Sequence, residues 1–419
     1  MTEDKVATNR DIPYLWMLAT DFHSNSKKDE LHFEKSSDGA VRDYSVNNDA
    51  VNLKRSGVPV MSNLMLRYYK RERIELECET ITPMFLGNAC QEAEWRAAPF
   101  KALFRYWWRV TQSGVPDVST LRSEEGKIFG SAGDEKDSGK SLLTVQVSSC
   151  SKMIAGIKKP FPKIKPIPHP ECERSHHEVN PLNYLAGMGL IHYKQGIQHS
   201  YFEDGNAFRL ILTFPKQNEK QIRPILGMIK AFGAVGSRSR NGWGSFDIKN
   251  MPFNINELTD DLLVNTQDWE KEFLIKDYPN YLGKDEKGLL VWSTDLQENW
   301  VNSMKALAHT YIQVRAGNVN DIGKLNPGNK SFAERHLLGI PLTNHSVGVR
   351  GNNARHASPL RFVVHRVGSG FRGIILHLPH RHSNDQAPKE INQTAVWKKI
   401  HQKLDGLELN RASYEECLS

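Results

Sequence analysis

Alternating polar and apolar positions predict a half-buried first strand that starts at Ile74. One side of this strand is apolar and the other is acidic, with Ile74, Leu76 and Cys78 facing one way and Glu75, Glu77 and Glu79 the other. A period of two residues is typical of a strand with one face on a core and one in solvent. The strand ends at Thr82 and Pro83, because proline has no backbone N–H for the ladder.

A helical period follows from Pro99, which suits the first turn, to about Val110. Its apolar face is formed by Phe100, Leu103, Phe104 and Trp107. Its basic side carries Lys101, Arg105, Trp108 and Arg109. We expect this helix to bury one face and to present a basic side with a tryptophan on it.

The next patterns complete an alternation of strands and helices. Two apolar runs, Leu142–Val147 and Phe208–Phe214, predict strands, and Ile222–Phe232 predicts a helix with Pro224 in its first turn. A glycine-containing loop then leads to a last strand, Ser245–Ile248. The order strand, helix, strand, strand, helix, strand predicts an α+β ferredoxin-like (RRM-like) domain, an antiparallel sheet with helices on one face.

A second unit is predicted from near Leu289. Residues from Trp300 to Tyr311 follow a helical period, and Leu360–Val367 and Phe371–Leu378 form a β-hairpin joined by three residues, Gly368 to Gly370. Val396, Trp397, Ile400 and Leu404 predict a closing helix. The order helix, paired strands and helix predicts a second, reduced copy of the same ferredoxin-like domain.

The predicted organisation has four parts. Residues 1–70 are an N-terminal extension, in which Asp21–Arg55 is polar and without sustained period, and which we expect to be partly mobile. Residues 71–250 form the first domain, 251–288 a linker, and 289–419 the second domain.

The composition bounds the function. The chain has 419 residues, 25% of them charged, a net charge of +7 and five cysteines without a CxxC pair, which favours a reducing cytoplasm and an anionic partner. No apolar run approaches the length that crosses a bilayer, so we expect no membrane partner.

The most informative segment is the loop Gly233–Phe246, with the sequence GAVGSRSRNGWGSF, between a predicted helix and a predicted strand. Its glycines allow close backbone approach, Arg238 and Arg240 offer forked phosphate donors, and Trp243 offers a stacking face. We interpret this loop as one that holds a nucleic-acid backbone. A flexible glycine turn with solvated arginines is the alternative.

This loop resembles the glycine-rich signature of the RAMP superfamily of CRISPR-associated proteins, although Ala234 stands where the pattern usually has its first glycine. Further motifs resemble the first-subunit family of the type III-B Cmr effector complexes. They are Thr82–Gly87 (TPMFLG), Arg96–Arg109 (RAAPFKALFRYWWR), Ile128–Ser131 (IFGS) and Arg355–Leu360 (RHASPL). The motifs occur in order between about Ile74 and Pro379.

The resemblance implies a non-catalytic RNA-binding subunit of a multi-subunit ribonucleoprotein. It implies a place near the 3′ end of the guide RNA (crRNA), a role in capturing target single-stranded RNA, and other Cmr-type RAMP subunits as neighbours. It implies neither a cofactor nor a small-molecule substrate. Because the first strand has no aromatic RNP signature, we expect RNA to meet loops and the basic helix side.

Two other segments are basic. The stretch from Ser151 to Pro170 has five prolines and no acidic residue, and it predicts an extended arm for phosphates or else a solvated loop. From His336 to Asn384 there is no Asp or Glu, and this stretch has six arginines: Arg350, Arg355, Arg361, Arg366, Arg372 and Arg381.

These features together give the expected RNA contacts. The candidates are Gly236, Ser237, Arg238, Ser239, Arg240, Gly242, Trp243, Gly244, Arg96, Lys101, Arg105, Trp108, Arg109, Lys158, Lys159, Arg355 and His356. The stacking candidates are Trp108 and Trp243, although one of Trp107 and Trp108 is expected to pack in the core.

A competing function is a metal-independent RAMP endoribonuclease that processes repeat RNA. The chain has 16 histidines, and His176, His177 and His192 are the candidates for general acid and base. A scaffold that touches only proteins would leave the glycine-arginine loop without a role.

Two further signals are discounted. The segment Gly133–Ser141 resembles a phosphate loop, but it has one residue too many before Gly-Lys-Ser, and a strand rather than a helix follows it. The spacing of His169, Cys172, His176 and His177 fits no standard zinc site, so we expect no bound metal.

Overall fold

The fold is α+β, built mainly from antiparallel sheets with helices packed on them, as the sequence predicts. The computed structural model describes residues 70–131, 139–149, 156–172, 177–192, 194–317, 332–339, 356–382 and 390–418. The predicted N-terminal extension lies outside these residues. None of the helices in the described part of the chain has the length and apolar character to cross a bilayer.

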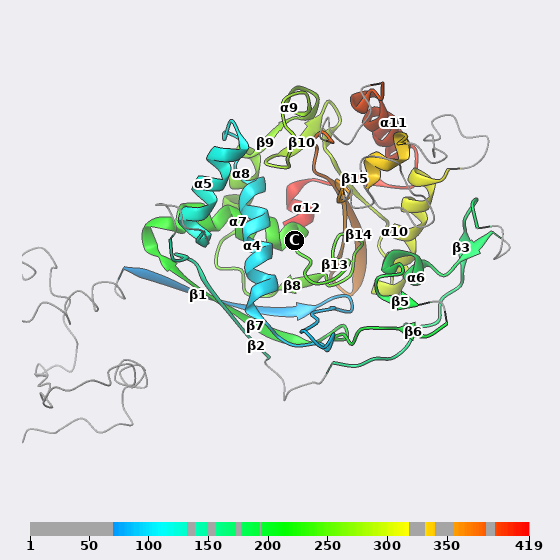
Figure 1. The fold of residues 1–419 in the computed structure, drawn as a ribbon, viewed down its shortest axis with the longest axis horizontal. Helices are drawn as coiled ribbons and strands as arrows, with labels where there is room; N and C mark the ends of the chain where they lie inside the picture. Colours follow the sequence, from blue (N-terminus) through cyan, green and yellow to red (C-terminus); the bar gives the residue numbers. More distant parts are fainter. Residues whose placement is uncertain are drawn as a thin grey trace, which may run out of the picture. The chain divides into compact units, whose positions relative to one another are not determined.

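The first half contains the predicted order of strands and helices. Its elements are β1 (Arg71–Thr80), α4 (Ala97–Val110), α5 (Val118–Phe129), β2 (Thr144–Ser149), β7 (Ala207–Pro215), a 3₁₀ turn (Lys216–Asn218), α7 (Glu219–Phe232) and β8 (Phe246–Ile248). The strands form one antiparallel sheet in the order β2-β7-β1-β8, and α4, α5 and α7 are on the same side of it (Figure 1). One correction concerns α7, which begins at Glu219, so that Pro224 lies beyond the first turn.

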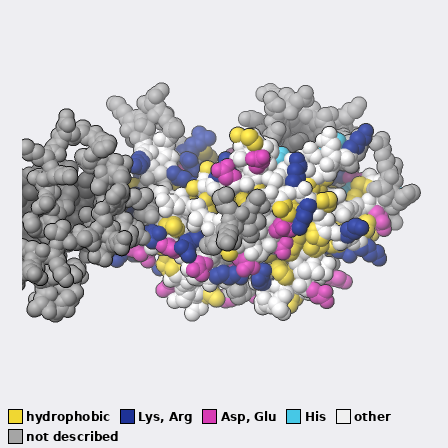
Figure 2. Space-filling view, turned by 90° about the horizontal axis from the view of Figure 1, so that it is seen from below, with side chains coloured by type: hydrophobic (Ala, Val, Ile, Leu, Met, Phe, Trp, Pro, Cys, Tyr) yellow, Lys and Arg dark blue, Asp and Glu magenta, His cyan; other side chains and the backbone are white. Residues whose placement is uncertain are grey.

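The alternation of β1 is confirmed. Leu76 is buried opposite Leu210 of β7, whereas Glu77 is exposed opposite Arg209. Figure 2, which views the molecule from the side of this sheet, shows acidic and basic side chains interleaved. The open face of the first sheet is therefore mixed in charge and carries no aromatic platform for bases.

The second half repeats the order of elements. Its elements are β12 (Val291–Ser293), α10 (Trp300–Arg315), a 3₁₀ helix (Glu334–Leu338), β13 (Leu360–Val367), β14 (Gly370–His377), α11 (Gln393–Asp405), β15 (Asn410–Arg411) and α12 (Tyr414–Leu418). The antiparallel sheet has the order β13-β14-β12-β15, so in both halves the third strand of the series lies between the second and the first. The hairpin loop has two residues instead of three, because Val367 pairs with Gly370, and Gly368 takes a positive φ of 58°.

The second sheet is buried on both faces, which the sequence analysis does not anticipate. Phe362 and Ile375 pack in a core with α10 and α11. Val363 and Ile374, the next pair in the register, belong instead to the core of the first half. The two halves thus share an apolar boundary, and the second sheet has helices from both halves against it.

The predicted linker needs correction, because residues 251–288 form packed elements. These are α8 (Ile255–Val264), β9 (Thr266–Asp268), α9 (Trp269–Phe273), β10 (Leu282–Asp285) and β11 (Gly288–Leu289), and the strands form a small sheet. Leu258 and Leu262 of α8 are buried in the core of the first half. Trp269 of α9 is buried in the core of the second half.

A long insertion separates β2 from β7. Its elements are β3 (Ile167–Pro168), β4 (Glu178–Val179), α6 (Pro181–Ala186), β5 (Ile191–His192) and β6 (Gly196–Ile197). Pro181 occupies the first position of α6, and the Asn180 side chain caps it by accepting a hydrogen bond from the Asn183 N–H. Leu182 and Leu185 of this helix are buried in the core of the second half, so the insertion bridges the two halves.

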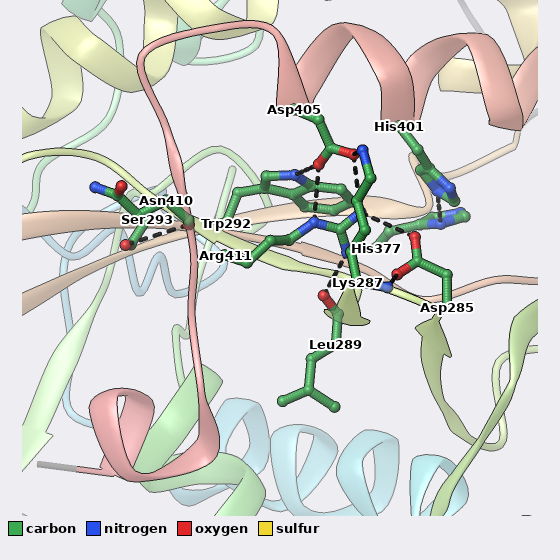
Figure 3. A network of polar contacts seen from close by, with 10 residues as sticks. All are labelled: Asp285, Lys287, Leu289, Trp292, Ser293, His377, His401, Asp405, Asn410 and Arg411. Atoms are coloured by element: carbon green, nitrogen blue, oxygen red, sulfur yellow. Dashed lines mark hydrogen bonds and ion pairs between the residues drawn. The ribbon is translucent and has the colours of Figure 1, made fainter.

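A polar network holds the start and the end of the second half together (Figure 3). The Asp405 carboxylate accepts hydrogen bonds of 2.8 Å from Trp292 Nε1, Arg411 Nε and Lys287 Nζ. Burial alone would raise the pKa of Asp405, but these three donors outweigh it and hold the pKa well below its ordinary value. The network joins the β10–β11 turn, β12, α11 and β15, so it ties these elements together.

Candidate nucleic-acid interface

A cleft of about 1430 Å³ is lined by both halves of the molecule. The first half contributes the loop from Ala234 to Asn241 and one side of α4. The second half contributes the last turns of α10 and the start of β13, and the insertion contributes the end of α6. The predicted glycine-rich loop is therefore a wall of this cleft, between elements that are far apart in the sequence.

Close backbone contacts fix the shape of the loop. Gly236 has a φ of 96°, and a Cβ there would lie 2.5 Å from the carbonyl oxygen of Phe85. Arg238 takes a φ of 59°, which is uncommon for a residue with a side chain. The Asn241 side chain donates a hydrogen bond of 2.8 Å to the carbonyl oxygen of Leu185 in α6. The loop is thus held in place and presents Arg238 to the cleft.

The charge of the cleft has one sign. Five arginines line it, and the lining includes no Asp or Glu: the arginines are Arg96, Arg238, Arg240, Arg315 and Arg361. None of the five makes an ion pair with another described residue. An arginine cluster without carboxylates favours an anionic ligand, because the guanidinium fork matches phosphate oxygens.

Arg361 is the most deeply placed of these arginines. It is 4% exposed, and its Cζ lies 4.7 Å from the centre of the Tyr106 ring and 5.1 Å from that of Trp107. Burial lowers the pKa of its guanidinium, which Tyr106 counteracts and Arg240 reinforces. The Cζ of Arg240 lies 5.8 Å from the same Tyr106 ring.

Arg315 lies at another corner of the cleft, beside two tyrosines. Its Nη1 donates a hydrogen bond of 3.3 Å to the hydroxyl of Tyr311. Burial would lower the pKa of Arg315, but Tyr311, Tyr184 and Glu171 raise it. Burial also raises the pKa of Tyr184 far above its ordinary value, so this hydroxyl stays protonated beside the arginine.

His356 is uncharged at neutral pH. Its ring centre lies 4.0 Å from that of His382 and 5.5 Å from that of His380. Burial, followed by the two histidines and Arg240, lowers the pKa of His356 to about 3. The residue therefore offers a neutral hydrogen-bonding ring to the cleft at neutral pH.

The structure brings seven of the predicted contacts together in this cleft. They are Arg96, Gly236, Ser237, Arg238, Ser239, Arg240 and His356. Arg355 lies outside the described residues. Gly242 and Gly244 are buried beneath the loop, where a Cβ would lie 2.6 Å from Met304 Sδ and 1.9 Å from the Val235 carbonyl oxygen, respectively. Those two glycines shape the loop from below and do not face a ligand.

The two predicted stacking tryptophans need correction. Trp243 is 0% exposed and stacks on Phe161 at 4.4 Å between ring centres, inside the core of the second half. Trp108 is 2% exposed and packs edge-on against Phe129. Because both rings are buried, neither has a free face for a base. Large aromatic rings stabilise a core most when they are fully packed.

The basic side of α4 lies outside the lining of the cleft. Arg105 and Arg109 both bind the buried carboxylate of Glu125 in α5, and one Arg109 hydrogen bond measures 2.8 Å. Burial and the neighbouring Arg105 lower the pKa of Lys101. The sequence alone hides this neutralisation because Glu125 belongs to a different helix.

The predicted phosphate arm is an extended segment next to the core of the second half. Phe161 anchors it against Trp243, whereas Lys158 and Lys159 are exposed. Lys159 pairs with Glu203. These lysines are accessible, but they do not line the cleft.

Three of the four described arginines of the acid-free stretch lie beside acidic residues from elsewhere in the chain. Arg366 pairs with Glu79 at 2.7 Å and Arg381 with Asp277 at 2.9 Å. Arg372 Nη1 lies 3.8 Å from a carboxylate oxygen of Glu416. Among the described arginines of the stretch, Arg361 alone lines the cleft. The sequence analysis did not single it out, and it missed Tyr106, Tyr184 and Arg315.

The two described candidate catalytic histidines, His177 and His192, do not line the cleft. His177 lies in a turn with its Nδ1 3.2 Å from the carbonyl oxygen of Pro170, and His192 Nδ1 accepts from the Lys194 and Gln195 N–H groups at 3.3 Å. His176 lies outside the described residues. Within the residues the structure describes, no group of three or more His, Cys, Asp or Glu side chains is placed to hold a metal ion.

The architecture is that of an α+β protein with two similarly ordered sheets and an arginine-lined cleft to which both halves contribute. Residues 77–247 match the family model of the RAMP superfamily, whose glycine-rich signature the loop resembles. No curated protein matches the chain.

Solved structures are similar to this chain at low sequence identity, among them the following. Cmr1 from Pyrococcus furiosus in the apo form has 20% identity and a TM-score of 0.44, with 81% of this chain and 98% of that chain covered. A chain of the type III-B Cmr-beta complex bound to cognate target RNA has 11% identity and a TM-score of 0.41, with 80% of this chain and 100% of that chain covered. A chain of type III-B Cmr-beta bound to cognate target RNA and AMPPnP, in the presence of ssDNA, has 12% identity and a TM-score of 0.40, with 79% of this chain and 98% of that chain covered.

Proposed function

We propose that the chain is a non-catalytic RNA-binding subunit of a type III-B CRISPR (Cmr) effector complex. The observation that carries this proposal is the cleft, where five arginines and no carboxylate converge from both halves. The RAMP superfamily match over residues 77–247 supports the assignment to this kind of ribonucleoprotein. The motifs that resemble the first-subunit family of Cmr complexes also support this assignment, and one of them, Arg355–Leu360, lies in the second half.

The fold proposal is two ferredoxin-like domains, residues 71–250 and 289–419. Support comes from the strand order, since β2-β7-β1-β8 and β13-β14-β12-β15 follow one scheme. Residues 251–288 are then a packed connection. In this arrangement the RNA lies between the domains, because the first sheet opens onto a face of mixed charge while its helices and loops line the cleft.

Binding in the cleft should depend on the RNA backbone. The aromatic rings that line it are Phe85, Tyr106, Tyr184 and Tyr311, and of these Phe85 and Tyr311 are buried. Tyr106 already has guanidinium groups over its ring. Arginine contacts to phosphates carry no sequence information, so the affinity should be similar for unrelated sequences.

For the assembly we propose the partners that the family resemblance implies. These are the guide RNA near its 3′ end, target single-stranded RNA, and neighbouring Cmr-type RAMP subunits. The interleaved charges on the open face of the first sheet would suit a protein neighbour better than RNA, because its carboxylates repel phosphates.

The proposed absence of catalysis is supported by the chemistry of the cleft. The one histidine among the lining residues is His356, whose pKa is lowered to about 3. A group with so low a pKa is a poor general base or general acid near neutral pH. His177 and His192 are not among the residues that line the cleft. An endoribonuclease that uses these histidines remains the alternative function.

The test is a binding titration of the purified chain with labelled single-stranded RNAs of unrelated sequence, in a salt series without metal. Replacing both Arg238 and Arg240 by glutamine should weaken binding by tenfold or more, about 1.4 kcal/mol, for every sequence. The control is Arg122→Gln, an exposed arginine of α5 outside the cleft, which should leave the affinity unchanged. Equal loss in the control, or none in the double variant, contradicts the proposal.

The same reactions distinguish the alternative function when they are run on a denaturing gel. Intact RNA at saturating protein supports a binding subunit. Discrete products that disappear in His177→Ala or His192→Ala, with binding retained, would identify an endoribonuclease.

A further inference from the structure

Arg361 carries a buried charge without a counter-charge. It is 4% exposed, and none of the described carboxylates contacts it. Its Nε makes no hydrogen bond to a described group. The surrounding sequence offers no acid either, since residues 336–384 contain neither Asp nor Glu. Burying a guanidinium in this state is unfavourable, so a residue there needs a reason other than stability.

The position within β13 makes this clearer. Arg361 shares a strand face with Val363, which lies in the core of the first half. An apolar side chain would fit this alternation and pack against α4. The guanidinium instead lies over Tyr106 and Trp107 and lines the cleft, so its charge is directed to a space that a ligand can enter.

A second cation lies near the first. Arg240 lowers the pKa of Arg361 and approaches the same Tyr106 ring. A main-chain hydrogen bond of 2.8 Å from the Phe362 N–H to the Arg240 carbonyl oxygen holds the two segments together. Two repelling guanidiniums held next to each other form a site that one anion would stabilise.

We propose that Arg361 and Arg240 form a built anion site at the floor of the cleft, which takes one phosphodiester group of a bound RNA. The proposal rests on the proposed function, because it assigns a phosphate position within the RNA-binding cleft. The two non-bridging oxygens of a phosphodiester can accept hydrogen bonds from the two guanidiniums, and their shared negative charge lies between the two cations. The bound phosphate supplies the counter-charge that the chain lacks.

The consequence is a residue that lowers stability and raises affinity. Replacing Arg361 by methionine, which keeps the length of the side chain and removes the charge, should raise the melting temperature of the RNA-free chain. The same change should weaken single-stranded RNA binding by tenfold or more. Adding inorganic phosphate should raise the melting temperature of the wild type more than that of Arg361→Met.

A matched control is Arg335→Met. Arg335 is 3% exposed and thus as buried as Arg361, but it donates hydrogen bonds of 2.7 Å to both carboxylate oxygens of Glu171. Removing it should lower the melting temperature and leave the response to phosphate unchanged. Arg361→Lys keeps the charge without the fork, and it should fold and bind RNA severalfold more weakly than wild type.

The outcomes separate this proposal from the function on which it rests. If the wild type binds RNA through Arg238 and Arg240, while Arg361→Met and Arg361→Lys bind as well as wild type, the phosphate site is wrong and the function stands. If the wild type binds no RNA, yet phosphate protects it through Arg361, the site serves another anion and the phosphodiester assignment is wrong. Should Arg361→Met not fold, an Arg361→Lys variant with wild-type affinity and phosphate response would also overturn the proposal.

Discussion

Single glycines determine whether the loop can form. Gly244 has a φ of 70°, and a Cβ there would lie 1.9 Å from the carbonyl oxygen of Val235. We expect Gly244→Ala to lower the free energy of unfolding by about 2–4 kcal/mol, because backbone must move to admit the methyl group. Urea unfolding followed by circular dichroism measures this loss.

Gly205 is the control for that prediction. Its φ of 76° is similar, but a Cβ there would have nothing within 4 Å. Gly205→Ala should therefore cost only the backbone strain, about 1 kcal/mol. Equal losses in the two variants would mean that the dihedral angle alone, and not the contact with Val235, requires glycine in the loop.

Two partly buried histidines should make the fold sensitive to acid. Burial and then Lys230 lower the pKa of His365 from an ordinary 6.5 to about 4, and burial lowers that of His380 to about 4. Above about pH 6.5 both rings are neutral in the folded and the unfolded chain, and their full contribution to stability is present. Between about pH 6.5 and 4 the unfolded chain binds protons that the folded chain does not, so stability is lost by about 1.4 kcal/mol per pH unit for each histidine.

The measurement is the free energy of unfolding from urea titrations between pH 7 and 4. His365→Gln removes one titrating ring and should have a smaller pH dependence than wild type over this range, whatever its stability at pH 7. An unchanged pH dependence would show that His365 does not contribute to the acid sensitivity.

At the scale of elements, α4 and α5 are joined by one carboxylate. Glu125 has a side chain that is 4% exposed and binds both Arg105 and Arg109. Burial would raise the pKa of Glu125, but hydrogen bonds from Arg109 and Arg105 hold it below its ordinary value. Glu125→Gln should lower the free energy of unfolding by about 1–3 kcal/mol, because it weakens charge-assisted hydrogen bonds.

The same variant tests where RNA binds. If the basic side of α4 contacted RNA, releasing two arginines from Glu125 should raise the affinity. The cleft proposal expects an unchanged affinity for single-stranded RNA in the same titration. A clear increase in the affinity of Glu125→Gln for RNA would mean that Arg105 and Arg109 contact the RNA.

The elements themselves were largely predictable because their patterns are local. β1, α4, β7, α7 and the hairpin of the second half all occur within a few residues of the predicted ranges. The connection 251–288 was interpreted wrongly because its helices and strands are short. The shared core was not predicted either, since a continuous apolar run such as Phe362–Val364 indicates burial without saying on which partner each face lies.

At the scale of the molecule, the site was predictable only in part. The loop was found because its glycines and arginines are adjacent in the sequence. The rest of the cleft comes from several separate segments of the chain. Three arginines of the acid-free stretch meet acids that lie far away in the chain, as Arg366 meets Glu79. Net charge over a segment therefore gave a poor estimate of the charge presented to a ligand.

The number of cleft arginines limits the salt dependence. If all five neutralise a phosphate, the log-log slope of affinity against salt should reach at most about −3.5 for single-stranded RNA. The salt titration of the wild type measures this slope. A steeper slope that Lys158→Gln and Lys159→Gln reduce would extend the interface to the exposed proline-rich arm.

The two-sided burial of the second sheet has a consequence for biosynthesis. Val363 and Ile374 complete a core whose other members, such as Leu76 and Leu210, leave the ribosome much earlier. Until β13 and β14 are made, the first half exposes the apolar surface that they later cover, and such surfaces aggregate or recruit chaperones. A fragment that stops after β8 should therefore aggregate when it is expressed alone. The cleft should form only when translation is nearly finished, because the second half supplies part of its lining.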